Sequence, residues 1–146
     1  MTDDVAYPSL TPLRLAAIGG ILWSAFGVFE FTTSATSDAA ALMARGLTQA
    51  QAEMYATMPL WMQAAFGIAT IGGVLGSLLL LLRRKLAVPV LGLSLIACVV
   101  LFIGDWALGV FALFGMVQVV TLCLVLLIAV LLLYGARRWA AKGLLN

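Results

Sequence analysis

Histidine is absent from this chain of 146 residues, and charged residues make up only 10% of it. Because histidine is the commonest metal ligand and titrates near neutral pH, its absence removes the usual zinc ligands, haem ligands and proton shuttles. The two cysteines, Cys98 and Cys123, fall inside apolar runs and form no C-x-x-C pair. We therefore expect both to behave as small apolar residues. The sequence therefore predicts no metal site and no cofactor.

Two other classes of functional motif are missing as well. The chain has no nucleophile placed with a base and no glycine-rich phosphate loop, so we expect it not to be an enzyme. Its basic residues are few and lie beside apolar runs, which does not fit a nucleic-acid interface.

Apolar residues are what the chain has in excess, at 64% against about half in an ordinary globular protein. We predict one transmembrane domain over 1–146, an all-α integral membrane four-helix bundle with membrane-spanning helices at about 15–34, 60–82, 86–105 and 111–134. Each run has about 20 residues, which at 1.5 Å per residue crosses a hydrocarbon core of roughly 30 Å.

The longest polar segment, at about 35–59, separates the first two spans and carries helix-start signals. Asp38 precedes an alanine-rich run that ends at Gly46, and Thr48 is followed three residues later by Gln51, a capping-box pattern. We therefore expect two short helices lying at the membrane surface.

The placement of basic residues predicts how the chain crosses the membrane. Seven of the eight basic residues flank the apolar spans: Arg14, Arg83, Arg84, Lys85, Arg137, Arg138 and Lys142. Since lysine and arginine concentrate in short cytoplasmic loops, we expect both chain ends in the cytoplasm and the 35–59 loop outside, with Arg45 as its one basic residue. The 83–85 and 137–142 clusters act either as topological anchors or as sites for anionic lipid.

Small residues form a stripe on each of the first two spans. In a helix, residues three or four apart share a face, and small side chains there let another helix come close in lipid. The stripes consist of Gly20, Ser24 and Gly27 on the first span, and of Ala65, Ala69, Gly72, Gly73, Gly76 and Ser77 on the second. They predict either close packing within one bundle or a seam between two copies.

Each span also carries one polar side chain, about 16 to 20 residues from its basic anchor and so roughly 24 to 30 Å along the helix. These residues are Glu30, Gln63, Asp105 and Gln118. If they face the bundle axis, Glu30 could bond to Gln63 or Gln118, or share a proton with Asp105, which would make a proton or cation site open to the outside. The alternative is that all four mark where the helices leave the hydrocarbon. No basic residue is expected near Glu30.

Three segments carry a resemblance to a known family. These are WSAFGVFEF, LTQAQAEMY and MPLWMQAAFGIATIGGVLGSLLLLLRRKLAVPVLGLSL, within about residues 22–95. The chain resembles an uncharacterised family of small four-span bacterial membrane proteins whose members are often automatically labelled "sugar transporter". The resemblance implies a multi-pass protein of the bacterial inner membrane. It also implies a role for the carboxylate of Glu30, because members tend to have aspartate there.

Three functions remain open at this point. The first is a non-enzymatic accessory or assembly subunit whose small-residue face binds another membrane protein or a second copy, in a homo-oligomer or larger complex. The second is a small-solute or proton-coupled transporter that acts as an oligomer and uses Glu30 as its coupling carboxylate. The third is a sensor whose outer loop binds a ligand.

Overall fold

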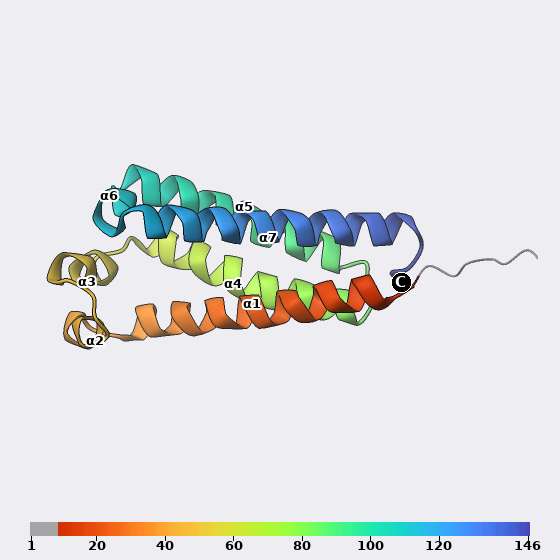
Figure 1. The fold of residues 1–146 in the computed structure, drawn as a ribbon, viewed down its shortest axis with the longest axis horizontal. Helices are drawn as coiled ribbons and strands as arrows, with labels where there is room; N and C mark the ends of the chain where they lie inside the picture. The colour runs from red at the N-terminus through yellow and green to blue at the C-terminus, as the bar shows by residue number, and fades with distance from the viewer. Residues whose placement is uncertain (1–8) are drawn as a thin grey trace, which may run out of the picture.

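The computed structural model describes residues 9–146, and this part of the chain is all-helical (Figure 1). Its seven helices are α1 (Thr11–Thr36), α2 (Ala39–Ala44), α3 (Gln49–Ala56), α4 (Leu60–Leu81), α5 (Ala87–Ala107), α6 (Val110–Phe114) and α7 (Met116–Ala141). Four of them, α1, α4, α5 and α7, are long and apolar enough to cross a membrane. The predicted fold class, an all-α membrane four-helix bundle with short helices between the first two spans, is confirmed.

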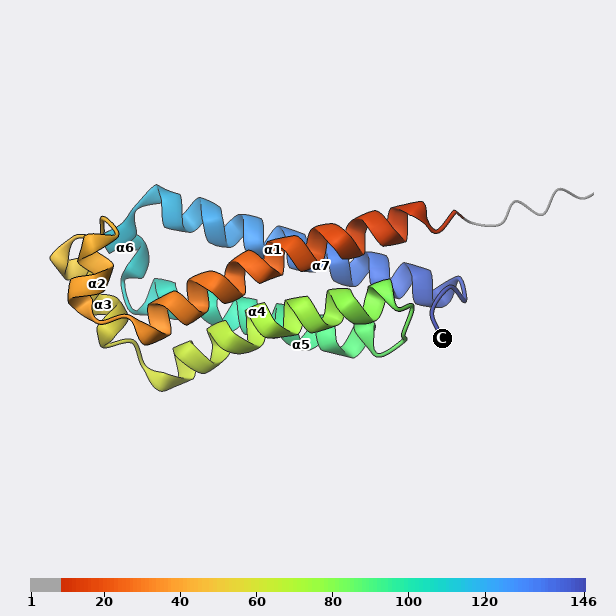
Figure 2. The ribbon, with the colours of Figure 1, turned by 90° about the horizontal axis from the view of Figure 1, so that it is seen from below.

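The four long helices run side by side, and the three short helices gather at one end of the bundle (Figures 1 and 2). We call this the loop end. The opposite end, which we call the basic end, holds the turn at residues 82–86 and the segment 143–146, and the residues of both basic clusters lie there.

The fourth span begins later than expected. Instead of one helix from about 111, the chain forms the short helix α6, turns at Gly115 and starts α7 at Met116. Gly115 has φ 72° and ψ −160°, a conformation that glycine alone adopts readily, so the helix cannot continue through it. α7 then continues to Ala141, beyond the expected end at about 134.

The outer surface of the bundle is apolar. Large side chains such as Leu22, which is 67% exposed, and Val117, which is 77% exposed, point away from the other helices. In water such a surface would drive association, whereas in hydrocarbon it carries no penalty. Together with the four long apolar helices, this surface indicates a multi-pass membrane protein.

The small-residue stripes pack inside the bundle. On the side of α4 that meets α1, Gly73 lies against Ser24, and a Cβ atom on Gly27 would come within 2.8 Å of Thr70 Cγ2. The same helix uses Gly72 and Gly76 against α5, and Ala65 and Ala69 are buried in an apolar cluster shared with α5. Gly20 and Ser77 meet in the same way at the α1–α4 contact. These stripes are therefore occupied by contacts within one chain.

The basic end is closed by apolar side chains from all four long helices. The cluster contains Leu13, Ala17, Leu80, Ala87, Leu91, Leu132, Leu133, Ala136 and Leu145. Leu145 belongs to the segment 143–146, which folds back after α7 and leaves this side chain only 2% exposed. Its neighbour Asn146 pairs with the 83–85 turn, since Lys85 N donates to Asn146 O at 2.7 Å and Asn146 N donates to Arg83 O at 2.6 Å.

The loop end includes the two short helices that the sequence predicts. Asp38 Oδ1 accepts a hydrogen bond from Ala41 N at 2.8 Å and so caps α2, and Thr48 and Gln51 form a complete capping box at the start of α3. α3 then packs on α6, with the rings of Tyr55 and Phe114 5.5 Å apart and edge to face. This contact holds α3 over the loop end of the bundle.

Candidate functional site

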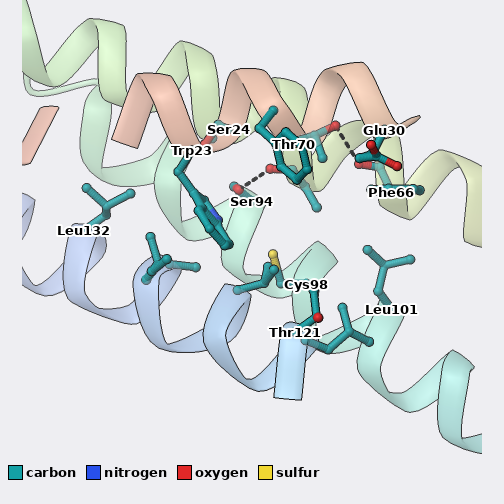
Figure 3. A pocket seen from close by; sticks show the side chains of 18 of the residues that line it. Trp23, Ser24, Glu30, Phe66, Thr70, Ser94, Cys98, Leu101, Thr121 and Leu132 are labelled. Carbon is teal, nitrogen blue, oxygen red and sulfur yellow. Dashed lines mark hydrogen bonds between the residues drawn. The ribbon is translucent and has the colours of Figure 1, made fainter. Parts of the chain in front are cut away.

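A cavity of about 230 Å³ lies among the long helices, on the side of the bundle toward the loop end (Figure 3). It arises because α7 packs along α5 and meets α1 in the apolar cluster at the basic end, while the two helices diverge toward the loop end (Figures 1 and 2). Leu91 and Leu132 line the cavity and also belong to the cluster, so they form its floor.

The wall of the cavity is mostly apolar and contains four aromatic side chains. Trp23 and Phe26 come from α1, Tyr55 from α3 and Phe66 from α4. Figure 3 shows Trp23 extending from α1 toward α7. The remaining wall consists largely of aliphatic residues of α5 and α7. A wall of this kind suits a ligand with an apolar surface, and the few polar groups in it would fix the orientation of that ligand.

Glu30 lies at the margin of this cavity and is paired with Arg45. Glu30 Oε1 is 3.5 Å from Arg45 Nη2, and both side chains are 40% exposed. The expectation that no basic residue lies near Glu30 was therefore wrong, because α2 folds back to the end of α1 and brings Arg45, the residue after α2, beside Glu30. An ion pair of this exposure contributes about 0 to 1 kcal/mol, so the two side chains can separate easily.

Asp105 and Gln118 are the two predicted site residues that the structure joins directly. Gln118 Nε2 donates to Asp105 Oδ2 at 2.9 Å and links α5 to α7 near the loop end. Asp105 is only 5% exposed, and both residues line a smaller cavity of about 70 Å³ beneath α3 and α6. Gln118 also lines the main cavity and so connects the two spaces.

Gln63 does not join the other three. Its Nε2 atom donates to Met58 O at 3.0 Å, and its side chain lines a separate pocket beside Ser34 and Asp38. Within residues 9–146, Glu30 makes no hydrogen bond to Gln63 or Gln118, and Gln118 is the bonded partner of Asp105. The sequence left open whether these four residues share one site. The structure has one bonded pair, Asp105 and Gln118, with Glu30 on the main cavity and Gln63 in a separate pocket.

Tyr55 lines the site but was not among the site residues that the sequence predicts. It lines both the main and the smaller cavity. Burial raises the pKa of its phenol above the ordinary 10.0, and the carboxylates of Asp105 and Glu30 raise it further, against a smaller opposing effect of Arg45. Gln51 lies one helical turn earlier on the same face and donates to Leu113 O at 3.4 Å, so that face of α3 turns inward. No local sequence pattern marks this, because the bond joins α3 to the distant α6.

Three hydroxyl groups of the cavity wall are already used by the helices. Thr70 Oγ1 donates to Phe66 O at 2.9 Å, Ser94 Oγ to Ala69 O at 2.6 Å and Thr121 Oγ1 to Val117 O at 2.8 Å. Among the residues that line the cavity, Glu30 alone carries a formal charge. The cavity therefore offers an apolar volume, aromatic faces and one carboxylate, with these hydroxyl donors engaged.

The predicted basic anchors lie together at the basic end, away from the cavity. Arg84, Lys85, Arg137 and Arg138 are exposed, and Arg83 Nε donates to Leu144 O at 2.8 Å. Arg83 adopts φ 58°, a left-handed conformation that is uncommon for a side-chain-bearing residue and that allows the tight turn into α5.

For the part of the chain from residue 9 onward, no group of three or more Cys, Asp or Glu side chains lies close enough to hold a metal ion. Comparison of the chain with protein-family models, with curated proteins and with solved structures finds no match.

Proposed function

We propose that this chain is a non-enzymatic protein of the bacterial inner membrane that binds a small solute among its four long helices and carries it across the bilayer. In this proposal Glu30 is the coupling carboxylate. The observation that carries the proposal is the cavity. All four long helices line it, Glu30 lies at its margin, and it is closed at the basic end.

A cavity closed at one end fits one state of an alternating-access cycle. In such a cycle the site stays in place while packed helices separate first on one side of it and then on the other. Here the contact between α1 and α7 lies in the apolar cluster of the basic end, through residues such as Leu13, Ala17 and Leu132. Separation of these two helices would open the floor of the cavity toward the basic end.

The orientation in this proposal places the basic end in the cytoplasm. Seven of the eight basic residues lie at that end, whereas Arg45 lies at the loop end, and lysine and arginine favour the cytoplasmic side. The cavity would then be nearer the outer surface. The same basic side chains would also attract anionic lipid of the cytoplasmic leaflet, at about 1 kcal/mol for each charge close to the surface.

An accessory or assembly subunit is the second candidate. The divergence of α1 and α7 leaves a gap in which a helix of another membrane protein could lie, and Phe26, on the cavity wall, is 59% exposed. The internal use of the small-residue stripes weakens the version of this hypothesis in which those stripes bind the partner.

Proteoliposomes that contain a pH-sensitive dye test the transport proposal. We expect at least one solute in a panel of sugars, carboxylates and amines to drive a proton flux in wild-type vesicles. The flux should be lost in Glu30→Gln and kept in Glu53→Gln, because Glu53 is exposed on α3 and does not line the cavity.

Two results would contradict the proposal. One is a flux that Glu30→Gln leaves unchanged. The other is the absence of any flux from a folded wild-type protein that is extracted together with a stoichiometric membrane partner, which would favour the accessory subunit.

A further inference from the structure

We infer that the cavity binds a compact organic cation with an apolar body, and that the cation takes the place of Arg45 beside Glu30. This inference rests on the proposed function in so far as it takes the cavity to be a solute site. It adds the chemical class of the solute and the competition at the carboxylate.

The volume and the wall define the apolar part of the ligand. An apolar cavity of about 150 Å³ is large enough to hold benzene, so about 230 Å³ accommodates an aromatic ring with a small substituent. Trp23, Phe26, Tyr55 and Phe66 surround this space, and aromatic faces attract cations, quaternary ammonium groups above all.

The polar groups of the wall favour positive over negative charge. Glu30 is the one formally charged residue that lines the cavity, and its carboxylate repels an anion. An anion would need N–H or O–H donors, and several of those in the wall are engaged. The hydroxyls of Thr70, Ser94 and Thr121 donate to backbone carbonyls, and Gln118 Nε2 donates to Asp105. A quaternary ammonium needs no acceptor, so the engaged hydroxyls do not hinder it.

The charges of the whole loop end act in the same direction. All four acidic residues in the described range, Glu30, Asp38, Glu53 and Asp105, belong to this end, and Arg45 is the one basic residue beside them. A cleft lined by one sign of charge raises the local concentration of ligands of the opposite sign. The loop end therefore attracts cations toward the cavity.

Arg45 is the cation that such a ligand would have to displace. Its guanidinium lies 3.5 Å from Glu30, is 40% exposed and does not line the cavity, so it can swing into solvent while the carboxylate stays at the margin. Because the exposed pair is weak, a ligand that also buries an aromatic body gains more than Arg45 loses.

A matched pair of probes separates charge from shape. Trimethylphenylammonium has a quaternary nitrogen where its isostere tert-butylbenzene has a carbon. We expect tritiated trimethylphenylammonium to bind saturably to the wild-type protein in phosphatidylcholine nanodiscs, and excess tert-butylbenzene to displace it poorly.

Three variants then locate the charge effect. Glu30→Gln should weaken cation binding by roughly tenfold or more, because it removes the carboxylate from a partly desolvated margin. Arg45→Ala should strengthen binding several-fold, since it removes the competitor, and a misfolded protein would not bind more tightly. Glu53→Gln, which removes a charge at the same end but outside the cavity, should stay within about twofold of the wild type.

Displacement of trimethylphenylammonium by tert-butylbenzene as effectively as by the cation itself would overturn the assignment of a cation. Unchanged binding in both Glu30→Gln and Arg45→Ala would overturn it too. In either case saturable binding of the probe would still support the cavity as a solute site. Absence of saturable binding to a protein whose circular dichroism shows native helix content would overturn it as well. Saturable cation binding without any solute-driven proton flux would support this inference and count against transport.

Discussion

The close contact between α4 and α5 at Gly76 allows a stringent test of the bundle. A Cβ atom on Gly76 would lie 2.6 Å from Cγ and Cδ2 of Leu91 and 3.3 Å from the Leu91 backbone nitrogen. Leu91 is buried in the cluster at the basic end and cannot move aside without disturbing it. Gly92, the next residue on α5, has no atom within 4 Å of the corresponding position, so Gly92→Ala is a matched control.

The two substitutions share one energy term and differ in another. Both replace a glycine inside a helix, and each gains about 1 kcal/mol of helix propensity from alanine. Only Gly76→Ala adds a methyl group to a filled space, which costs typically about 1 to 3 kcal/mol. We therefore expect Gly76→Ala to be less stable than Gly92→Ala by about 1 to 3 kcal/mol, because the propensity term cancels in the comparison.

Reversible unfolding in mixed micelles with increasing dodecyl sulfate, followed by tryptophan fluorescence, would measure this difference. Equal unfolding free energies for Gly76→Ala and Gly92→Ala would refute the close α4–α5 contact. A wider separation of these helices would also change the cavity, since Leu91 forms part of its floor.

Two further predictions concern the loop end. Thr48→Ala removes the side chain that accepts a hydrogen bond from Gln51 N at 3.3 Å, and we expect a local loss of about 1 kcal/mol, seen as faster amide hydrogen exchange in α3 but not in α4. Tyr55 has a pKa raised above 10.0, chiefly by burial. Its contribution to the free energy of unfolding is therefore complete below pH 10.0 and is lost as pH rises through the raised pKa. Phenolate absorbance should show its late ionisation together with loss of α3 protection, and Tyr55→Phe should abolish both effects.

Local patterns predicted most of the fold. Hydropathy located the four spans, and the sequences after Asp38 and Thr48 located two helices of less than three turns each. These features could be read directly because each depends on residues within one or two turns of each other. The start of α7 was misplaced because the apolar run continues on both sides of Gly115, and composition does not reveal its backbone conformation.

The site was less predictable than the fold because its contacts join distant segments. Counting residues from the basic anchors placed Asp105 and Gln118 at one level, and they do bond. The same count could not give the direction in which each side chain points, so Gln63 was grouped with them although it bonds to Met58. The pairing of Glu30 with Arg45 depends on how α2 folds back, which no local rule specifies.

The position of Leu145 has a consequence for the order in which the protein matures. This side chain packs in one cluster with Leu13 of the first helix, and Lys85 and Asn146 are paired through their backbones. During synthesis Leu145 leaves the ribosome after all four long helices. The first helix, α1, therefore lacks its contact with Leu145 until the other three long helices have been made. The apolar cluster at the basic end can therefore be completed only after α7 and Leu145 have been synthesised.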